Sequence, residues 1–258
     1  MLHSLAFGLV LRHGLRKPAR GDGVGRLKGI RTMSRTDPAL TATAIVDSDH
    51  PAVIAFAQDT LGNTAGDDRA TAIRLYYAVR DGFRYDPYRV DLSAAGLSAS
   101  RVLENGYGWC IPKAVLLAAA CRVAGIPARL GFANVRNHLS TQRLRDALGT
   151  DTYYYHGYTT ILLGGRWVKA TPSFNIELCA KMNIGALEFD GESDSILHPF
   201  SLTGEQHMEY LAMHGEFDDV PRDDVVAAFA AHYPNLKVLG TADWEADVAQ
   251  EGAINAPA

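Results

Sequence analysis

The chain has 258 residues, 47% of them hydrophobic and 21% charged, so it can bury a substantial core and is not expected to be disordered over most of its length. The net charge of −4 argues against a nucleic-acid-binding domain, for which a basic surface would be expected. No apolar run is long enough to cross a bilayer. The three cysteines form neither a C-x-x-C pair nor a regular spacing, which predicts free thiols in a reducing cytoplasm rather than a disulfide framework or a zinc site.

The first 32 residues differ in composition from the rest of the chain. They carry seven basic residues and one acid, whereas the remainder carries 18 basic and 28 acidic residues. The apolar run at residues 5–11 is short and lacks a charged leading region, which argues against a signal peptide, while the Arg-rich composition leaves a transit peptide open. We interpret residues 1–32 as a disordered leader or an over-extended start, with ordinary domain composition from Met33.

Helix-capping residues divide the next part of the chain into short elements. Asp67 and Asp68 can cap a helix and supply its acidic first turn, and Gly62 can close the helix before it. Residues 33–66 are therefore read as an N-terminal lead-in segment, and the core begins at residue 67. The elements predicted before the cysteine are an extended run around residues 39–46, helices over 51–58 and 67–79, a turn into an extended segment at 83–90, and a short helix over 98–104.

The most informative stretch is NGYGWCIPKAVLLAAACRVAGIPAR, which places Cys110 behind a glycine-rich approach at the start of a helix. The helix is predicted from about Ile111 to Val123, with Gly125 as its C-terminal cap. Pro112 agrees with this start, because proline is tolerated in the first turn of a helix. Since first-turn N–H groups and the aligned peptide dipoles favour negative charge, we expect Cys110 to lose its proton more readily than an ordinary cysteine.

A β region follows the cysteine helix. ARLGFANV, residues 128–135, has the pattern of a strand, and a polar loop through Gly149 separates it from a hairpin with arms 153–163 and 166–171 around Gly164-Gly165. If the two glycines form a tight turn, opposed residue numbers sum to 329. Side chains alternate along strands, so one face of the hairpin is then shared by His156, Tyr158, Thr171 and Ser173.

The C-terminal part carries weaker signals. We predict helices near residues 175–182 and 223–232, a C-terminal extension over residues 177–250 that packs on a core at 67–176, and a disordered tail at 251–258. The histidines and acids of this part match no compact metal-binding spacing, so neither a metal nor a cofactor is expected. Cys121 and Cys179 are interpreted as packing residues.

Thiol catalysis needs a thiolate, a base that later donates a proton, a group that orients the base, and donors for the developing oxyanion. Among nine histidines, His156 is the best candidate base, because it lies in the aromatic-rich strand YYYHGYTTILL and Gly157 leaves space beside it. A lone strand histidine is more often structural. The combination with Cys110 favours a catalytic role.

Together these residues resemble the transglutaminase-like superfamily. The resemblance is carried by G-W-C at residues 108–110, C-R-x-A-G-I-P-A-R at 121–129, His156, and R-W-V-K-A-T-P at 166–172, and it extends over roughly residues 68–175. It implies an α+β, papain/transglutaminase-like core, in which the cysteine at a helix N-terminus packs on an antiparallel sheet that carries the histidine. It also implies acyl chemistry at amides: transglutamination, peptide hydrolysis, deamidation or de-N-glycosylation.

One position departs from the family pattern. The family usually has an aspartate just before the proline that follows the histidine hairpin, and this chain has Thr171 there. A threonine hydroxyl can accept the imidazole N–H but supplies no negative charge to stabilise an imidazolium. Asn175 lies on the same face if the chain stays extended, which would give a Cys-His-Asn arrangement. Thr171 and Asn175 are equally favoured as the orienting residue, with Ser173 behind them.

We therefore predict that Cys110 attacks an amide carbonyl of a protein or peptide substrate while His156 protonates the leaving amine, and that water or a second amine resolves the acyl-thioester. The backbone N–H of Cys110 is the expected oxyanion donor, Asn105 or Trp109 can add another, and Tyr158 can line the pocket. The alternative is a weak or inactive transglutaminase-like fold that binds a peptide or partner. Acyl-CoA-dependent transfer is a third reading, without a recognisable CoA site. The oligomeric state is left open.

Overall fold

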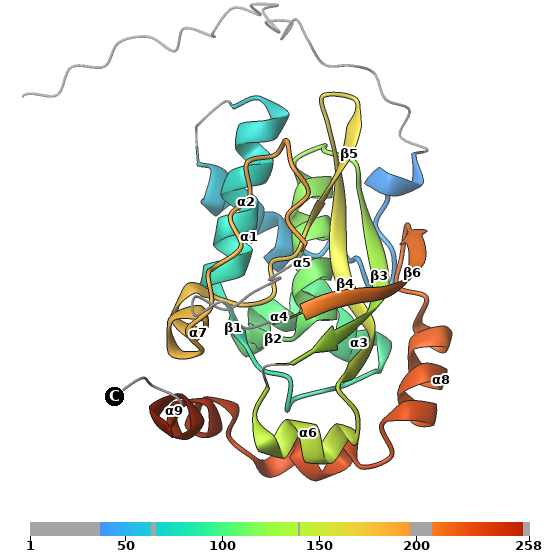
Figure 1. Ribbon diagram of the computed structural model, residues 1–258. Helices are drawn as coiled ribbons and strands as arrows, with labels where there is room; N and C mark the ends of the chain where they lie inside the picture. Colours follow the sequence, from blue (N-terminus) through green and yellow to red (C-terminus); the bar gives the residue numbers. More distant parts are fainter. Residues whose placement is uncertain (1–36, 63–65, 139, 197–207, 255–258) are drawn as a thin grey trace, which may run out of the picture. The chain divides into compact units, whose positions relative to one another are not determined.

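The computed structural model describes residues 37–62, 66–138, 140–196 and 208–254, and the structural statements below concern these residues (Figure 1). The predicted leader, residues 1–32, lies outside them. The helices are η1 (Pro38–Leu40), α1 (Pro51–Leu61), α2 (Asp68–Gly82), α3 (Ala94–Leu97), α4 (Ala99–Asn105), α5 (Cys110–Val123), α6 (Gln142–Leu148), α7 (Ile176–Lys181), α8 (Arg222–His232), η2 (Leu236–Thr241) and α9 (Trp244–Ile254). The strands are β1 (Arg84–Tyr85), β2 (Tyr107–Gly108), β3 (Ala128–Asn137), β4 (Thr152–Leu163), β5 (Arg166–Ala170) and β6 (Met208–Phe217).

An antiparallel sheet with the strand order β5-β4-β3-β6 forms the β layer. Its combination with helices confirms the expected α+β class. A second, two-stranded sheet pairs β1 with β2 in parallel and sets Tyr85 opposite Gly108, two residues before Cys110. This small sheet fixes the chain as it approaches α5.

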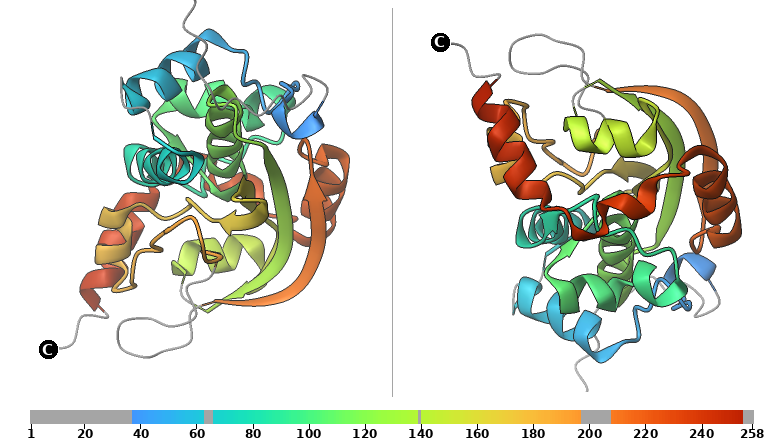
Figure 2. Two further views of the ribbon diagram at one scale, coloured as in Figure 1. Left: turned by 90° about the horizontal axis from the view of Figure 1, so that it is seen from above. Right: turned by 90° about the horizontal axis from the view of Figure 1, so that it is seen from below.

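Helix α5 is the centre of the core. All of its residues from Cys110 to Arg122 are buried, as expected for a helix that is apolar on every side. It packs against β3 and β4 on one side and against α1, α2 and α4 on the other. Figure 2 shows β3 and β6 curving around this helix. The position of the first turn of α5 is therefore set by both layers.

The β4–β5 hairpin has the predicted register. Thr159 pairs with Ala170 and Leu163 with Arg166, so opposed residue numbers sum to 329. Gly164 and Gly165 have φ angles of 58° and 84°, the left-handed values that a tight two-residue hairpin turn requires. The turn chemistry therefore determines which side chains share a face of the hairpin.

Several other predictions need correction. The run around residues 39–46, expected to be extended, begins with the 3-10 helix η1, for which the Asp37 side chain caps the first turn. The polar loop before the hairpin contains α6, capped by Thr141. The C-terminal extension does more than pack on the core, because its strand β6 joins the sheet beside β3. Helix α9 continues to Ile254, four residues into the expected tail.

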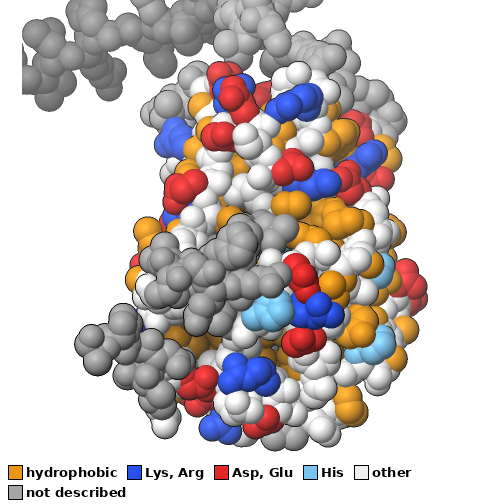
Figure 3. All heavy atoms as spheres, in the orientation of Figure 1, with side chains coloured by type: hydrophobic (Ala, Val, Ile, Leu, Met, Phe, Trp, Pro, Cys, Tyr) orange, Lys and Arg blue, Asp and Glu red, His pale blue; other side chains and the backbone are white. Residues whose placement is uncertain are grey.

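The C-terminal elements also reach the start of α5. Phe229 of α8 packs on Trp109, and Trp244 of α9 contacts Tyr85 and Tyr88 edge-on. On the face drawn in Figure 3, acidic and basic side chains are interspersed. None of the helices in the described ranges is both long enough and apolar enough to cross a membrane.

Candidate functional site

Cys110 is the first residue of α5, and no side chain caps this end of the helix. The thiol lies beside three backbone N–H groups, those of Gly157, Ile111 and Cys110 itself, and each of them lowers the pKa of Cys110. The side chain is only 7% exposed. Burial outweighs the N–H groups and raises the pKa of Cys110 to about 11. The expectation of an easily ionised thiol is thus wrong for this closed arrangement, because desolvation exceeds the effect of the helix N-terminus.

Strand β4 brings His156 to the same end of α5. Its neighbour Gly157 lies directly against the helix, since an added Cβ would be 3.1 Å from the Cα of Ile111. The missing side chain of Gly157 therefore leaves room for the backbone of α5. His156 is buried, its Nδ1 atom has no hydrogen-bond partner among the described residues, and burial lowers its pKa to about 4. At neutral pH the closed site therefore holds a neutral thiol and a neutral imidazole.

Two hydroxyl groups in the segment after β5 are also buried. The Oγ1 atom of Thr171 and the Oγ atom of Ser173 lack hydrogen-bond partners among the described residues. The pairing of β4 with β5 ends at Thr159 and Ala170, and Thr171 and Ser173 lie in the segment that follows. The backbone N–H of Thr171 donates to the carbonyl of Ser195 at 2.8 Å, which holds this segment beside the strand edge.

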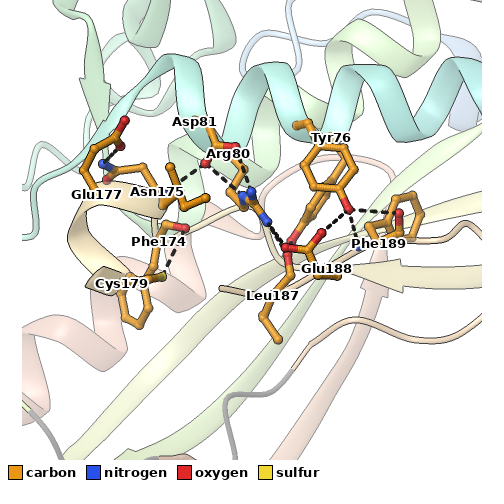
Figure 4. Close-up of polar contacts among 12 residues, drawn as sticks. Tyr76, Arg80, Asp81, Phe174, Asn175, Glu177, Cys179, Leu187, Glu188 and Phe189 are labelled. Atoms are coloured by element: carbon orange, nitrogen blue, oxygen red, sulfur yellow. Dashed lines mark hydrogen bonds and ion pairs between the residues drawn. The ribbon is translucent and has the colours of Figure 1, made fainter. Parts of the chain in front are cut away.

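The side chain of Asn175 forms hydrogen bonds with residues other than His156. Its Oδ1 atom accepts the backbone N–H of Tyr85 at 3.1 Å, and its Nδ2 atom donates to Glu177 at 2.8 Å (Figure 4). Both ends of the amide therefore have partners other than His156. In this arrangement Asn175 fixes β1, and its predicted role in orienting the imidazole gains no support.

The three predicted substrate-binding residues lie in different surroundings. Trp109 is 5% exposed and packs on Phe229 with ring centroids 5.7 Å apart. Tyr158 is 1% exposed, and its ring lies over Gly131, whose missing Cβ makes the room. Asn105 is exposed at the end of α4. Trp109 and Tyr158 are thus buried walls, whereas Asn105 is on the surface.

Other groups near Cys110 were not singled out in the sequence. Four phenols are close enough for the charge of Cys110 to raise their pKa values further, after burial as the main cause: Tyr85, Tyr153, Tyr210 and Tyr233. Lys113, one turn after the cysteine, is completely buried. The aromatic run YYYHGY and a lysine inside an apolar helix were the available signals. Within the described ranges, no group of three or more potential metal-ligating residues occurs.

Part of the chain is similar to known proteins. Residues 54–172 match the family model of the transglutaminase-like superfamily. A search of curated proteins finds no match. The solved structures that resemble the chain include a candidate cysteine protease from Cytophaga hutchinsonii, with 16% identity, a TM-score of 0.41, and coverage of 69% of this chain and 53% of that one. A candidate protease from Parabacteroides distasonis shows 18% identity and a TM-score of 0.33, over 49% of this chain and 25% of that one.

This chain thus spans about half the length of the first of these structures and a quarter of the second. The family match begins in α1 and ends at Pro172, so it includes the cysteine helix and the histidine hairpin. Through this segment, the chain is similar to the transglutaminase-like superfamily.

Proposed function

We propose that this protein is a thiol enzyme that acts on amide bonds of peptides or proteins through an acyl-thioester on Cys110. The observation that carries the proposal is the position of Cys110 at the uncapped start of α5, beside the N–H of Gly157 and hence next to His156 in β4. A helix N-terminus and a neighbouring strand supply a nucleophile, a base and N–H donors from rigid elements.

The reaction would proceed in two stages. His156 takes the proton of Cys110, the thiolate attacks the amide carbonyl, and the N–H of Cys110 stabilises the oxyanion. The C–N bond then breaks, and His156 returns the proton to the leaving amine. In the second stage His156 deprotonates water or an amine, which attacks the thioester and releases an acid or a new amide together with the thiol.

The closed site must change before this chemistry starts. Proton transfer from Cys110 to His156 is unfavourable in the closed site, because burial raises the pKa of the thiol and lowers the pKa of the imidazole. Both shifts arise mainly from burial, so solvent or a substrate amide entering the site would reduce them. We infer that the described arrangement is a resting state, which must open before a substrate reaches Cys110.

Either of two hydroxyls can orient the imidazole. The buried oxygen of Ser173 has no partner among the described residues, the hydroxyl of Thr171 interacts with Tyr210, and the amide of Asn175 is occupied. We propose that one of these hydroxyls accepts the Nδ1–H of His156. Replacing both with alanine should lower the rate more than replacing Asn175, and equal effects of the two changes would contradict this assignment.

The test compares the two buried cysteines of α5, Cys110 and Cys121. Purified protein is incubated with casein and a fluorescent primary amine, and both amine incorporation and peptide release are followed. Cys110→Ala should abolish both products and any hydroxylamine-sensitive acyl adduct, while Cys121→Ala, in the same buried helix, should retain them. Product formation by Cys110→Ala at the rate of the unmodified protein would end the proposal.

A binding module is the second candidate. It is favoured by the substitution at Thr171 and by the neutral states of Cys110 and His156 in the closed site. This function predicts saturable peptide binding that survives Cys110→Ala and leaves no covalent adduct. The two candidates therefore differ in a single measurement, the retention of substrate mass on Cys110.

A further inference from the structure

Strand β4 is irregular directly before His156. Two cross-strand pairs that are separated by one residue of β3 are separated by two residues of β4. These pairs are Ala133 with His156 and Val135 with Tyr153. Tyr154 and Tyr155 therefore stand together opposite Asn134, which makes this part of β4 a β-bulge. Tyr155 has a φ of 54°, a left-handed value that is rare for a bulky residue and persists only where its surroundings hold it.

The bulge determines which side chains of β4 share a face of the sheet. Residues 153 and 156 are three apart and would lie on opposite faces of a regular strand. Their partners in β3 are two apart and share a face, so Tyr153 and His156 share that face as well. Tyr210 of β6 pairs with Val135 from the other side and joins them. Besides burial, the charge of Cys110 contributes to the raised pKa values of Tyr153 and Tyr210, so this face of the sheet is the one near the thiol.

The residues on either side of the bulge confirm this division. Tyr154, next to Tyr153, stacks its ring on His232 of α8, with centroids 3.6 Å apart and an interplanar angle of 1°. Gly157, two residues after Tyr155, has its backbone N–H beside the thiol of Cys110. The bulge thus lies within the segment of β4 that meets the nucleophile.

Side-chain oxygens accept the two N–H groups of the bulge. The Tyr155 N–H donates to the Oδ1 atom of Asn134 at 3.2 Å, and the Tyr154 N–H donates to the hydroxyl of Tyr233 at 2.6 Å. The same Asn134 oxygen accepts a hydrogen bond from the Nε2 atom of His214 at 2.7 Å, since a carboxamide oxygen can only accept. The His214 ring also stacks on the Tyr155 ring, with centroids 4.2 Å apart and an interplanar angle of 2°.

Strand β6 is irregular at the same level of the sheet. The pairs on either side of His214 are Phe132 with Gly215 and Ala133 with Met213. His214 is therefore an extra residue of β6, and its side chain reaches Asn134 across the strand boundary. Asn134 alternates with the β3 partners of Tyr153 and His156, so it belongs to the opposite face of the sheet. Asn134 thus ties the left-handed residue of β4 to β6 from behind the site.

We propose that Asn134 is a positioning residue, which holds the β4 bulge so that Tyr153 and His156 share the face of the sheet near Cys110. This inference rests on the proposed roles of Cys110 and His156. Because Asn134 belongs to the other face, it acts through the backbone of Tyr155 and takes no part in the reaction itself.

The experiment measures which residue of β4 faces the thiol. Tyr153→Cys and Tyr154→Cys are each treated with a short bismethanethiosulfonate cross-linker, and peptide mass spectrometry separates links to Cys110 from links to Cys121 and Cys179. We expect a link to Cys110 from position 153 and none from position 154. Asn134→Leu keeps the bulk of the side chain but removes the acceptor. A regular strand would then bring residue 154 to the face of His156, so the link should move to position 154. A link that stays at position 153 would overturn the proposal.

Tyr155→Gly supplies the matched control and covers the case in which Asn134→Leu does not fold. Glycine adopts a φ of 54° without the strain of a tyrosine, so a bulge with glycine at this position no longer needs Asn134. In the double variant Asn134→Leu/Tyr155→Gly, the link should return to position 153. A role of Asn134 in packing alone would not be corrected by a change at position 155. A double variant that is unfolded, or that is linked from position 154, therefore contradicts the inference.

Activity measurements distinguish this inference from the proposed function. With casein and a fluorescent amine, Asn134→Leu should lower kcat about a hundredfold with little change in KM, and adding Tyr155→Gly should restore kcat. A KM effect without a kcat effect would contradict a positioning role. The cross-links form without turnover. An unmodified protein that lacks amide activity would refute the proposed function, and the link positions would still decide whether Asn134 holds the bulge.

Discussion

Gly157→Ala tests the contact that joins the histidine strand to the cysteine helix. The new Cβ would lie 3.1 Å from both the Cα and the Cγ1 of Ile111, and the Cα belongs to a helix backbone that is packed on both sides. Overpacking of this kind costs about 1–3 kcal/mol, and restriction of the unfolded chain returns about 0.4–1 kcal/mol. We expect a net loss of about 0.5–2 kcal/mol. The Gly157 N–H also moves away from Cys110, so the pKa of the thiol should rise further.

Gly82 and Gly131 provide comparisons for Gly157. Gly82 is the last residue of α2, and a Cβ added there has no heavy atom within 4 Å. Gly82→Ala should therefore stabilise the protein by up to about 1 kcal/mol. Gly131→Ala places a Cβ 2.1 Å from the ring of the buried Tyr158 and should cost more than Gly157→Ala. Urea unfolding gives the three free energies, and the pH dependence of Cys110 alkylation reports the thiol. A Gly157→Ala variant as stable as Gly82→Ala would show that β4 does not pack against α5 as closely as described.

Two further changes probe the surroundings of the site. Tyr76→Phe removes a hydroxyl that donates to the Leu187 carbonyl at 2.8 Å and the Thr171 carbonyl at 3.2 Å, and should reduce the free energy of unfolding by about 1–3 kcal/mol. Tyr77→Phe loses a bond to the exposed Glu188 and the acceptor of the Phe189 N–H at 3.1 Å, both nearer the surface, and should cost less than Tyr76→Phe in the same urea titration. His156 has a folded pKa of about 4, below its ordinary value of 6.5, so the unfolded chain takes up a proton first and stability falls as pH drops from about 6.5 to 4. This loss, at most about 3 kcal/mol, should be absent in His156→Gln, and a parallel pH dependence of the two proteins would show that His156 is not buried in the neutral form.

The parts of the fold that could be predicted are those determined by local chemistry. Gly164-Gly165 permits the tight turn, and the turn then fixes every pair of the hairpin through Leu163 and Arg166. The cysteine helix is marked by Pro112 in its first turn and Gly125 after its end, and the structure has it from Cys110 to Val123. Such signals need no knowledge of distant residues.

The parts that were missed depend on long-range contacts. Strand β6 carries exposed Leu211 and Met213, so its alternation is weak, and it is defined by pairing with β3 some 80 residues earlier. The helix N-terminus, a local feature, predicts a low pKa for Cys110, whereas the burial that raises this pKa depends on the tertiary packing around α5. Asn175 was placed on the catalytic face by strand alternation, but α7 begins directly after it and turns its amide toward Tyr85.

The unpartnered polar atoms of the closed site bear on its function. Buried side-chain atoms without a partner in the described structure occur at His156, Thr160, Thr171, Ser173 and Trp244. Each such atom costs about 1–3 kcal/mol, and native proteins keep few of them. His156 lies in β4, and Thr171 and Ser173 lie in the segment after β5, whose backbone is hydrogen-bonded to Tyr76, Lys113 and Asp81. Random packing defects would not concentrate next to a held backbone. A site that must accept and release a proton, however, needs free acceptors on a fixed frame, and this argument favours catalysis over binding alone.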